Sequence, residues 1–215
     1  MAATFAFPLL EQAEELARLG NWSAEVYRDL MAYQQGRIAG SELRRKYCHT
    51  LAIMQLDMTG MTETAMHGGS LLSFVRVLDA HKVCVPVLRA HQAGHVRAFA
   101  DDLTATFPDP DQALNAALDI HDRMQALNAA QADPARRVLC CIGLGFGEVF
   151  AIGLDKAMGD EMNRAAKLGE DTAKGGETLI TEAFHAGVAG RADCVFERRS
   201  DDELPFGFYS VARKP

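Results

Sequence analysis

The sequence predicts an α+β sandwich in which helices pack on one mainly antiparallel sheet. Short apolar runs of strand length alternate with longer segments in which apolar residues recur at helical spacing. Gly and Pro separate most of these segments, and several neighbouring strands are close enough in the chain to form hairpins. The order is a strand, helices, a hairpin, a helix, a hairpin, a helix, a strand and a final hairpin, which is typical of the α+β class.

Residues 1–49 are expected to form an N-terminal helical extension. Apolar residues recur at helical spacing from Leu9 to Ala17, and Gly20 is suited to end that helix. Ser23 is suited to cap a second helix. Such an extension could pack on its own domain, pair two subunits or relay a signal, and we favour the first two roles.

Residues 50–215 are expected to form the main domain. Its expected elements are a strand over 51–56, a helix over 71–78, a helix over 83–91 that Pro86 divides or kinks, a hairpin over 96–100 and 103–107, a helix over 109–130, strands over 137–144 and 148–152, a helix over 162–173, a strand over 178–181 and a closing hairpin over 195–198 and 206–211. The helix that starts at Asp109 has the clearest boundary, because a capping residue precedes Pro at the first helical position.

Three alternating glycines, Gly143, Gly145 and Gly147, suggest either a phosphate-binding loop or a tight turn. The segment lacks the lysine of a P-loop and joins two predicted strands rather than a strand and a helix. We therefore expect a tight hairpin between these strands.

Composition and charge exclude several classes of protein. The formal net charge of −7 argues against a nucleic-acid-binding surface, which requires clustered Lys and Arg. No apolar run approaches the roughly 20 residues of a membrane span, and no signal peptide opens the chain, so we expect a cytoplasmic protein without membrane contact. The five cysteines include no Cys-x-x-Cys pair, and we expect all of them to be reduced, with Cys140 and Cys141 on opposite faces of a strand.

Two aspartates are candidate metal ligands. Asp57 follows a short apolar run and precedes a turn at Gly60, and Asp101 begins another strand-like segment. Carboxylates at adjacent strand ends would form an oxygen-rich site for a hard cation such as Mg²⁺. The alternative is that each aspartate is only a turn residue.

Four blocks, in the same order, resemble the class III adenylate/guanylate cyclase catalytic domain over roughly residues 48–213. The blocks are Asp57-x-x-Gly60-x-Thr62, where Met61 replaces the family's Phe; Ala100-Asp101, usually Gly-Asp; Ile142-Gly143-x-Gly145-x-Gly147-Glu148-Val149, similar to the Gly-Ile-His-x-Gly-Glu hairpin; and Gly159-x-x-Met162-Asn163-x-Ala165-Ala166-Lys167-Leu168, similar to the Gly-x-x-Val-Asn-x-Ala-x-Arg-Leu helix. The interval between the two aspartates also agrees with the family's spacing. The resemblance implies a divergent bacterial-type member with the family's ferredoxin-like sandwich.

The resemblance implies a two-metal mechanism that forms a 3′,5′-cyclic nucleotide and pyrophosphate from a nucleoside triphosphate. Asp57 and Asp101 would hold two Mg²⁺ or Mn²⁺ ions, with the carbonyl of Met58 as a further ligand. Asn163 falls at the position that orients the ribose. Lys167 falls at the position of an Arg that stabilises the transition state, where Lys keeps the charge but loses the bidentate fork.

The positions that correspond to base recognition differ from the adenylate cyclase pattern. Arg97 stands where adenylate cyclases carry Lys, and Lys156 stands where they carry Asp or Thr, although Asp155 is adjacent. The 6-amino group of adenine needs an acceptor, which a cationic Lys156 does not offer. We therefore expect a preference for GTP or UTP.

The resemblance also implies a head-to-tail homodimer, because the family builds each site from two catalytic domains and this chain carries both sets of residues. The main hypothesis is thus a homodimeric nucleotidyl cyclase. The first alternative is a degenerate domain that binds nucleotide or a partner without turnover, which Arg97, Lys156 and Lys167 favour. The second is a small α+β protein of unrelated role, in which the four blocks are coincidental.

Overall fold

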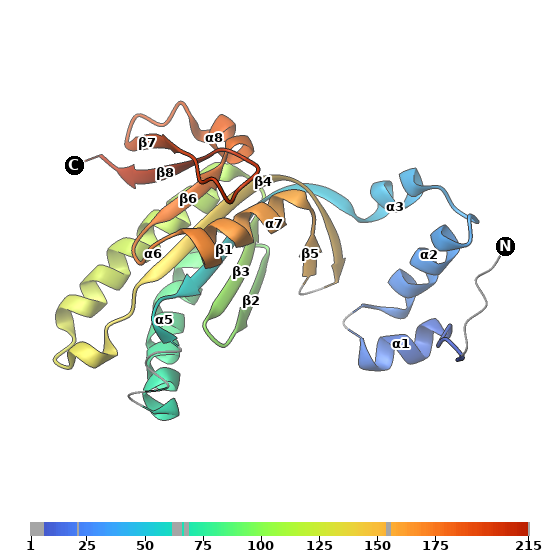
Figure 1. The fold of residues 1–215 in the computed structure, drawn as a ribbon, viewed down its shortest axis with the longest axis horizontal. Coiled ribbons are helices and arrows are strands. Elements are labelled where there is room, and N and C mark those ends of the chain that lie inside the picture. Colours follow the sequence, from blue (N-terminus) through green and yellow to red (C-terminus); the bar gives the residue numbers. More distant parts are fainter. Residues whose placement is uncertain (1–6, 21, 62–65, 67–68, 154–155, 215) are drawn as a thin grey trace. The chain divides into compact units, whose positions relative to one another are not determined.

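The computed structural model describes residues 7–20, 22–61, 66, 69–153 and 156–214. Its elements in chain order are α1 (Ala13–Leu19), α2 (Ala24–Gln34), α3 (Gly40–Tyr47), β1 (Cys48–Met58), α5 (Ser70–Ala90), β2 (His95–Phe99), β3 (Asp102–Phe107), α6 (Pro110–Ala130), the short 3₁₀ helix η1 (Pro134–Arg136), β4 (Cys140–Gly153), β5 (Lys156–Met158), α7 (Asp160–Ala166), the π-helix η2 (Lys167–Thr172), β6 (Thr178–Thr181), α8 (Glu182–Val188), β7 (Cys194–Arg199) and β8 (Phe208–Arg213) (Figure 1). None of the helices described is both long and apolar enough to cross a membrane.

The strands form one mixed sheet in the order β2-β3-β1-β4-β6-β8-β7, with β5 paired to β4. Neighbouring strands are antiparallel at β1–β3, β2–β3, β4–β5, β6–β8 and β7–β8, and parallel at β4–β6. The predicted α+β class with a mainly antiparallel sheet is therefore confirmed, as are the hairpins β2–β3 and β7–β8.

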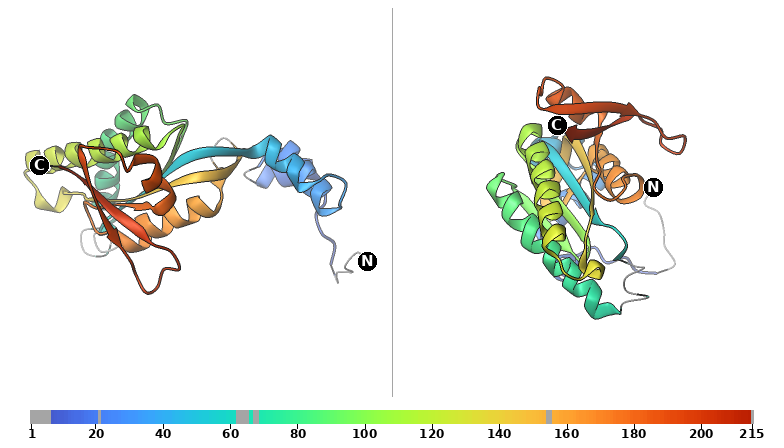
Figure 2. Two further views of the ribbon diagram at one scale, coloured as in Figure 1. Left: turned by 90° about the horizontal axis from the view of Figure 1, so that it is seen from above. Right: turned by 90° about the vertical axis from the view of Figure 1, so that its left-hand side faces the viewer.

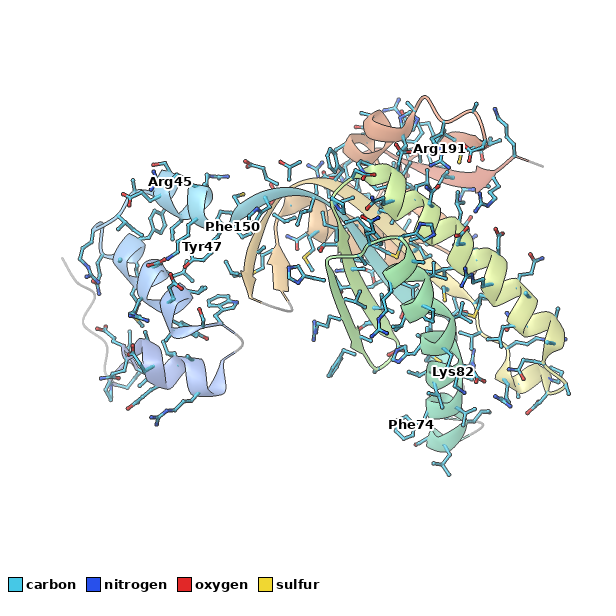
Figure 3. The ribbon with its side chains drawn as sticks, turned by 180° about the vertical axis from the view of Figure 1, so that it is seen from behind. Arg45, Tyr47, Phe74, Lys82, Phe150 and Arg191 are labelled. Carbon is cyan, nitrogen blue, oxygen red and sulfur yellow. The ribbon has the colours of Figure 1, made fainter. Side chains whose placement is uncertain are left out.

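The chain divides into two compact units, one formed by residues 1–49 with 150–158 and the other by residues 50–149 with 159–215. In the first unit, Lys46 of α3 contacts two carboxylates of α2, with Nζ 2.5 Å from Glu25 Oε1 and 2.6 Å from Asp29 Oδ2. Tyr47 also donates a hydrogen bond to Asp29 at 2.7 Å, and the guanidinium of Arg44 lies over the ring of Phe150 on β4. Figure 3 labels Tyr47 and Phe150.

In the larger unit, helices cover both faces of the sheet (Figure 2). Side chains of α5 and α6 pack with Met54, Leu56, Ile142 and Leu144 of the central strands in the main hydrophobic core. The intervening residues of β4 point to the other face because successive side chains of a strand alternate. There the glycines of β4 contact α7 and η2.

One expected element is wrong, and two others differ in detail from the prediction. The triplet Gly143, Gly145 and Gly147 lies inside β4, so the predicted tight hairpin at 143–147 does not exist; the described strands instead pair as β4–β5. α5 continues through Pro86 as a single helix, so Pro86 does not divide it into two pieces; Pro86 and Lys82, the residue whose carbonyl Pro86 leaves without a helical N–H partner, are both exposed. The expected helix over 162–173 consists of α7 followed by the π-helix η2.

Local signals gave correct predictions elsewhere. Asp109 caps α6 by accepting a hydrogen bond from the Gln112 N–H at 2.9 Å, and Ser23 caps α2. All five cysteines are free, as expected. Cys140 lies in the main core, whereas Cys141 donates from the opposite face to the carbonyl of Ala173.

Candidate functional site

Asp57 and Asp101 lie at the same edge of the sheet. Asp57 is the penultimate residue of β1, and Asp101 lies in the turn that joins β2 to β3. Antiparallel pairing sets Leu56 opposite Leu103, and Phe99 pairs with Asp102 across the hairpin. This register brings the end of β1 beside the β2–β3 turn.

Several acidic groups act on the carboxylate of Asp57. Burial and the negative charge of Asp101 raise the pKa of Asp57 to about 6, and Asp102 and Glu170 act in the same direction with smaller effects. The backbone N–H of Met58 partly opposes this shift by donating to the carboxylate. Concentrated negative charge that is only partly solvated is the environment in which a divalent cation is stabilised.

Glu170 is an acidic neighbour of Asp57 that the sequence did not reveal. It belongs to η2, which approaches β1 because Gly169 has no side chain: a Cβ at this position would lie 2.6 Å from the carbonyl oxygen of Gln55. Burial and the charge of Asp102 raise the pKa of Glu170. Nothing in the local sequence indicates this approach, since it depends on how η2 packs on the sheet.

The glycines of β4 determine the position of α7. A Cβ at Gly145 would lie 2.6 Å from the Glu161 carbonyl oxygen, and one at Gly143 would collide with the carbonyl of Ala165. Glu161 then anchors the helix by accepting hydrogen bonds from Phe146 N–H at 3.3 Å and the Thr181 hydroxyl at 2.6 Å. The glycine stripe therefore serves helix packing.

Asn163 and Lys167 lie on the exposed side of this helical segment, four residues apart and hence on one face. Lys167 Nζ lies 2.9 Å from Asp171 Oδ2, and this contact raises the pKa of Lys167. Among the described residues, Glu203 and Asp201 are the next largest charges acting on Lys167. The structure thus brings Asn163 and Lys167 together, but on a surface whose electrostatic partners differ from those of Asp57.

The residues expected to contact the base fall on two hairpins. Arg97 is an exposed residue of β2 whose guanidinium lies 5.4 Å from the centre of the Phe99 ring, and its charge partly offsets the raised pKa of Asp102. Lys156 begins β5, in the unit formed with residues 1–49. Asp155, like Thr62 of the first metal block, lies outside the described residues.

The donor set around Asp57 fits Mg²⁺ or Mn²⁺. Within the described ranges, no three His, Cys, Asp or Glu side chains converge to form a complete metal-binding cage. Mg²⁺ characteristically needs no such cage, because one or two carboxylates hold it while water and substrate phosphates supply the other ligands. Asp57 and Asp101, with the Met58 carbonyl adjacent, provide oxygen donors of this kind.

Comparisons with known proteins identify the fold. No family model matches the sequence, and no curated protein matches it. Solved structures do match, among them the guanylate cyclase domain of RhGC from Catenaria anguillulae in complex with GTP, at 17% identity over 77% of this chain and 97% of that chain, with a TM-score of 0.64. An adenylate/guanylate cyclase/hydrolase from Silicibacter pomeroyi matches at 20% identity, 78% and 98% coverage and a TM-score of 0.65. The adenylyl cyclase CyaB from P. aeruginosa matches at 15% identity, 78% and 96% coverage and a TM-score of 0.63.

Proposed function

We propose that this chain, which has the fold of the class III adenylate/guanylate cyclase catalytic domain, is a nucleotidyl cyclase that forms a 3′,5′-cyclic nucleotide and pyrophosphate from a nucleoside triphosphate. The observation that carries the proposal is that the strand register places Asp57, near the end of β1, beside the β2–β3 turn that holds Asp101. In agreement with this placement, burial and then the negative charge of Asp101 raise the pKa of Asp57 to about 6. Residues 50–215 would be the catalytic domain, and residues 1–49 a helical extension that supports the dimer.

Asp57, Asp101 and the Met58 carbonyl would hold two Mg²⁺ or Mn²⁺ ions. Such ions activate the attacking 3′-hydroxyl and stabilise the charge on the departing pyrophosphate. The two carboxylates would hold the positively charged ions at this end of β1, next to the turn that follows the strand. Cation binding would also remove the repulsion between the carboxylates, so the metal-free protein is expected to bind divalent cations without nucleotide.

Asn163 and Lys167 would act on the nucleotide held by a second copy of the chain. Asn163 would orient the ribose, and Lys167 would place a positive charge beside the reacting phosphate. The support is electrostatic: Asp171, rather than Asp57, is the main partner of Lys167 within its own chain. A head-to-tail homodimer would bring each exposed Asn163–Lys167 face to the other copy's Asp57.

Complementation tests this arrangement. Asp57→Asn and Asn163→Ala are each expected to be inactive alone, and mixing them should restore activity through the one intact site of the mixed dimer. Two well-folded variants that form mixed dimers without regaining activity would contradict the shared site.

The residues at the positions expected to contact the base favour a base that presents carbonyl oxygens. Arg97 offers donors to such a base, and Lys156 offers no acceptor to the amino group of adenine. Asp155 would supply an acceptor if the loop shifted by one residue. We expect GTP or UTP to react faster than ATP, measured by mass spectrometry of products from the four nucleoside triphosphates with the same metal. Fastest turnover of ATP would remove this preference.

A second candidate is a degenerate domain that binds nucleotide or a partner without turnover. The observation in its favour is the pairing of Lys167 with Asp171, which a phosphate would have to displace. Nucleotide binding by calorimetry, with no cyclic product from any nucleoside triphosphate in Mg²⁺ or Mn²⁺, would support this candidate. Cyclic product that disappears in Asp101→Ala would exclude it.

A further inference from the structure

Arg76 of α5 is a buried arginine beside the segment that follows Asp57. Its residue is only 7% exposed, and burial lowers its pKa. Placing a guanidinium in such an environment is costly unless its N–H groups are hydrogen-bonded. Two of them donate to consecutive backbone carbonyls: Nη2 to Thr59 at 3.1 Å and Nη1 to Gly60 at 3.3 Å.

The turn that Arg76 contacts is also hydrogen-bonded to Leu139, the residue that precedes β4. Thr59 donates both its backbone N–H, at 2.9 Å, and its hydroxyl, at 3.1 Å, to the carbonyl of Leu139. Gly60 has a positive φ of 70°, which a non-glycine residue rarely adopts. The chain after Asp57 is therefore fixed between Leu139 and Arg76, in a conformation that depends on Gly60.

The direction of the two carbonyls has a consequence for ligand binding. In a trans peptide the N–H points opposite to the C=O, so carbonyls of Thr59 and Gly60 that face Arg76 turn the following peptide N–H groups away from it. This peptide orientation is set two residues after Asp57 and directly after Met58, so a change in it would move the oxygen donors proposed for the metal.

We propose that Arg76 is a positioning residue of the metal–nucleotide site, which acts by holding the Thr59 and Gly60 carbonyls and thereby the Asp57 turn. The inference rests on the cyclase function proposed above. A purely structural Arg76 would affect stability alone, whereas a positioning Arg76 affects metal affinity and turnover in molecules that are still folded.

The test uses Arg76→Met, which keeps much of the volume but removes the donors, and Arg76→Lys, which keeps the charge and one donor group. Arg191→Met is the matched control, because Arg191 (labelled in Figure 3) is also a hydrogen-bonded arginine that is mostly shielded from solvent. Its partners are Asp111, Asn115 and Asp193, which are far along the chain from the Asp57 turn. Mn²⁺ binding is measured by electron paramagnetic resonance of free Mn²⁺, without nucleotide, and kcat and KM are measured with Mn²⁺ and GTP or UTP.

Loss of a residue that orients a metal site typically costs about 10- to 100-fold in affinity or activity, and we expect a loss in this range for Arg76→Met, with partial recovery in Arg76→Lys. Arg191→Met should unfold at a lower temperature but bind Mn²⁺ as the wild type does. Wild-type Mn²⁺ affinity and kcat/KM in a folded Arg76→Met, or an equal loss in Arg191→Met, would overturn the positioning role. If circular dichroism finds Arg76→Met unfolded, Arg76→Lys replaces it in the test, and wild-type Mn²⁺ affinity and kcat/KM in that variant would overturn the positioning role.

The two proposals fail separately. A wild type that forms cyclic nucleotide while the Arg76 variants behave normally overturns the positioning role alone. A wild type that binds Mn²⁺ in an Arg76-dependent manner but forms no cyclic nucleotide overturns the enzymatic function alone.

Discussion

Replacing Gly143 by alanine should displace the helix that carries Asn163. A methyl group at position 143 would lie 2.6 Å from the backbone nitrogen of Gly169 and closer still to the carbonyl oxygen of Ala165. Since a relaxed contact needs about 3.5 Å, the helical segment would have to retreat by about 1 Å or more. Backbone atoms cannot rotate away as a flexible side chain can, so the strain falls on the strand and helix together.

The expected cost follows from overpacking, about 1–3 kcal/mol in free energy of unfolding. For a chain of this size each kcal/mol lowers the unfolding midpoint by about 2–4 °C, so Gly143→Ala should unfold about 2–12 °C below the wild type. A 1 Å displacement of a group that positions substrate can lower the rate by about 10²-fold, which is the expected loss in kcat/KM.

Thermal unfolding by circular dichroism and a cyclisation assay measure these effects. Gly190→Ala is the matched control, because a Cβ at Gly190 meets no described atom within 4 Å and Gly190 does not have a positive φ. If Gly143→Ala matched Gly190→Ala in both midpoint and rate, the packing of α7 and η2 on β4 would be refuted.

Three further predictions concern the site and the core. Lys167→Arg should raise kcat, because the guanidinium group of Arg can bind phosphate through two N–H groups while still reaching Asp171. An unchanged or lower kcat would argue against contact between residue 167 and phosphate. Mn²⁺ should raise the unfolding midpoint of the wild type, and this increase should vanish in Asp101→Asn; persistence would place the cation elsewhere. Burial lowers the pKa of His121, so the unfolded state binds its proton more readily and stability should fall as pH drops below about 6.5. His121→Gln should therefore lose less stability in urea titrations between neutral and mildly acidic pH, and an equal loss would assign the pH dependence to other groups.

The parts of the fold that could be predicted are those that local chemistry determines. The Asp109 cap and the two hairpins depend on residues that are near one another in the chain, and each is present. Pro86 misled the prediction because its effect depends on exposure: on the solvent side of α5 the carbonyl it frees can bind water.

The glycines of β4 misled the prediction for a different reason. Judged from its neighbours in the sequence alone, a glycine suggests a turn. Gly143 and Gly145 instead leave room for α7, a helix that comes more than ten residues later in the chain. Glu170 and Arg76 were missed for the same reason, since both reach the Asp57 region through packing between distant segments. The resemblance of ordered blocks predicted the fold, whereas the supporting residues of the site emerged only from the structure.

The most direct test of the cyclase function is the product balance. Protein incubated with GTP or UTP and Mg²⁺ and analysed by phosphorus NMR should yield 3′,5′-cyclic nucleotide and pyrophosphate in equal molar amounts, and Asp101→Ala should abolish both products. Nucleoside diphosphate with inorganic phosphate, no product at all, or a product that survives Asp101→Ala would contradict the proposed function.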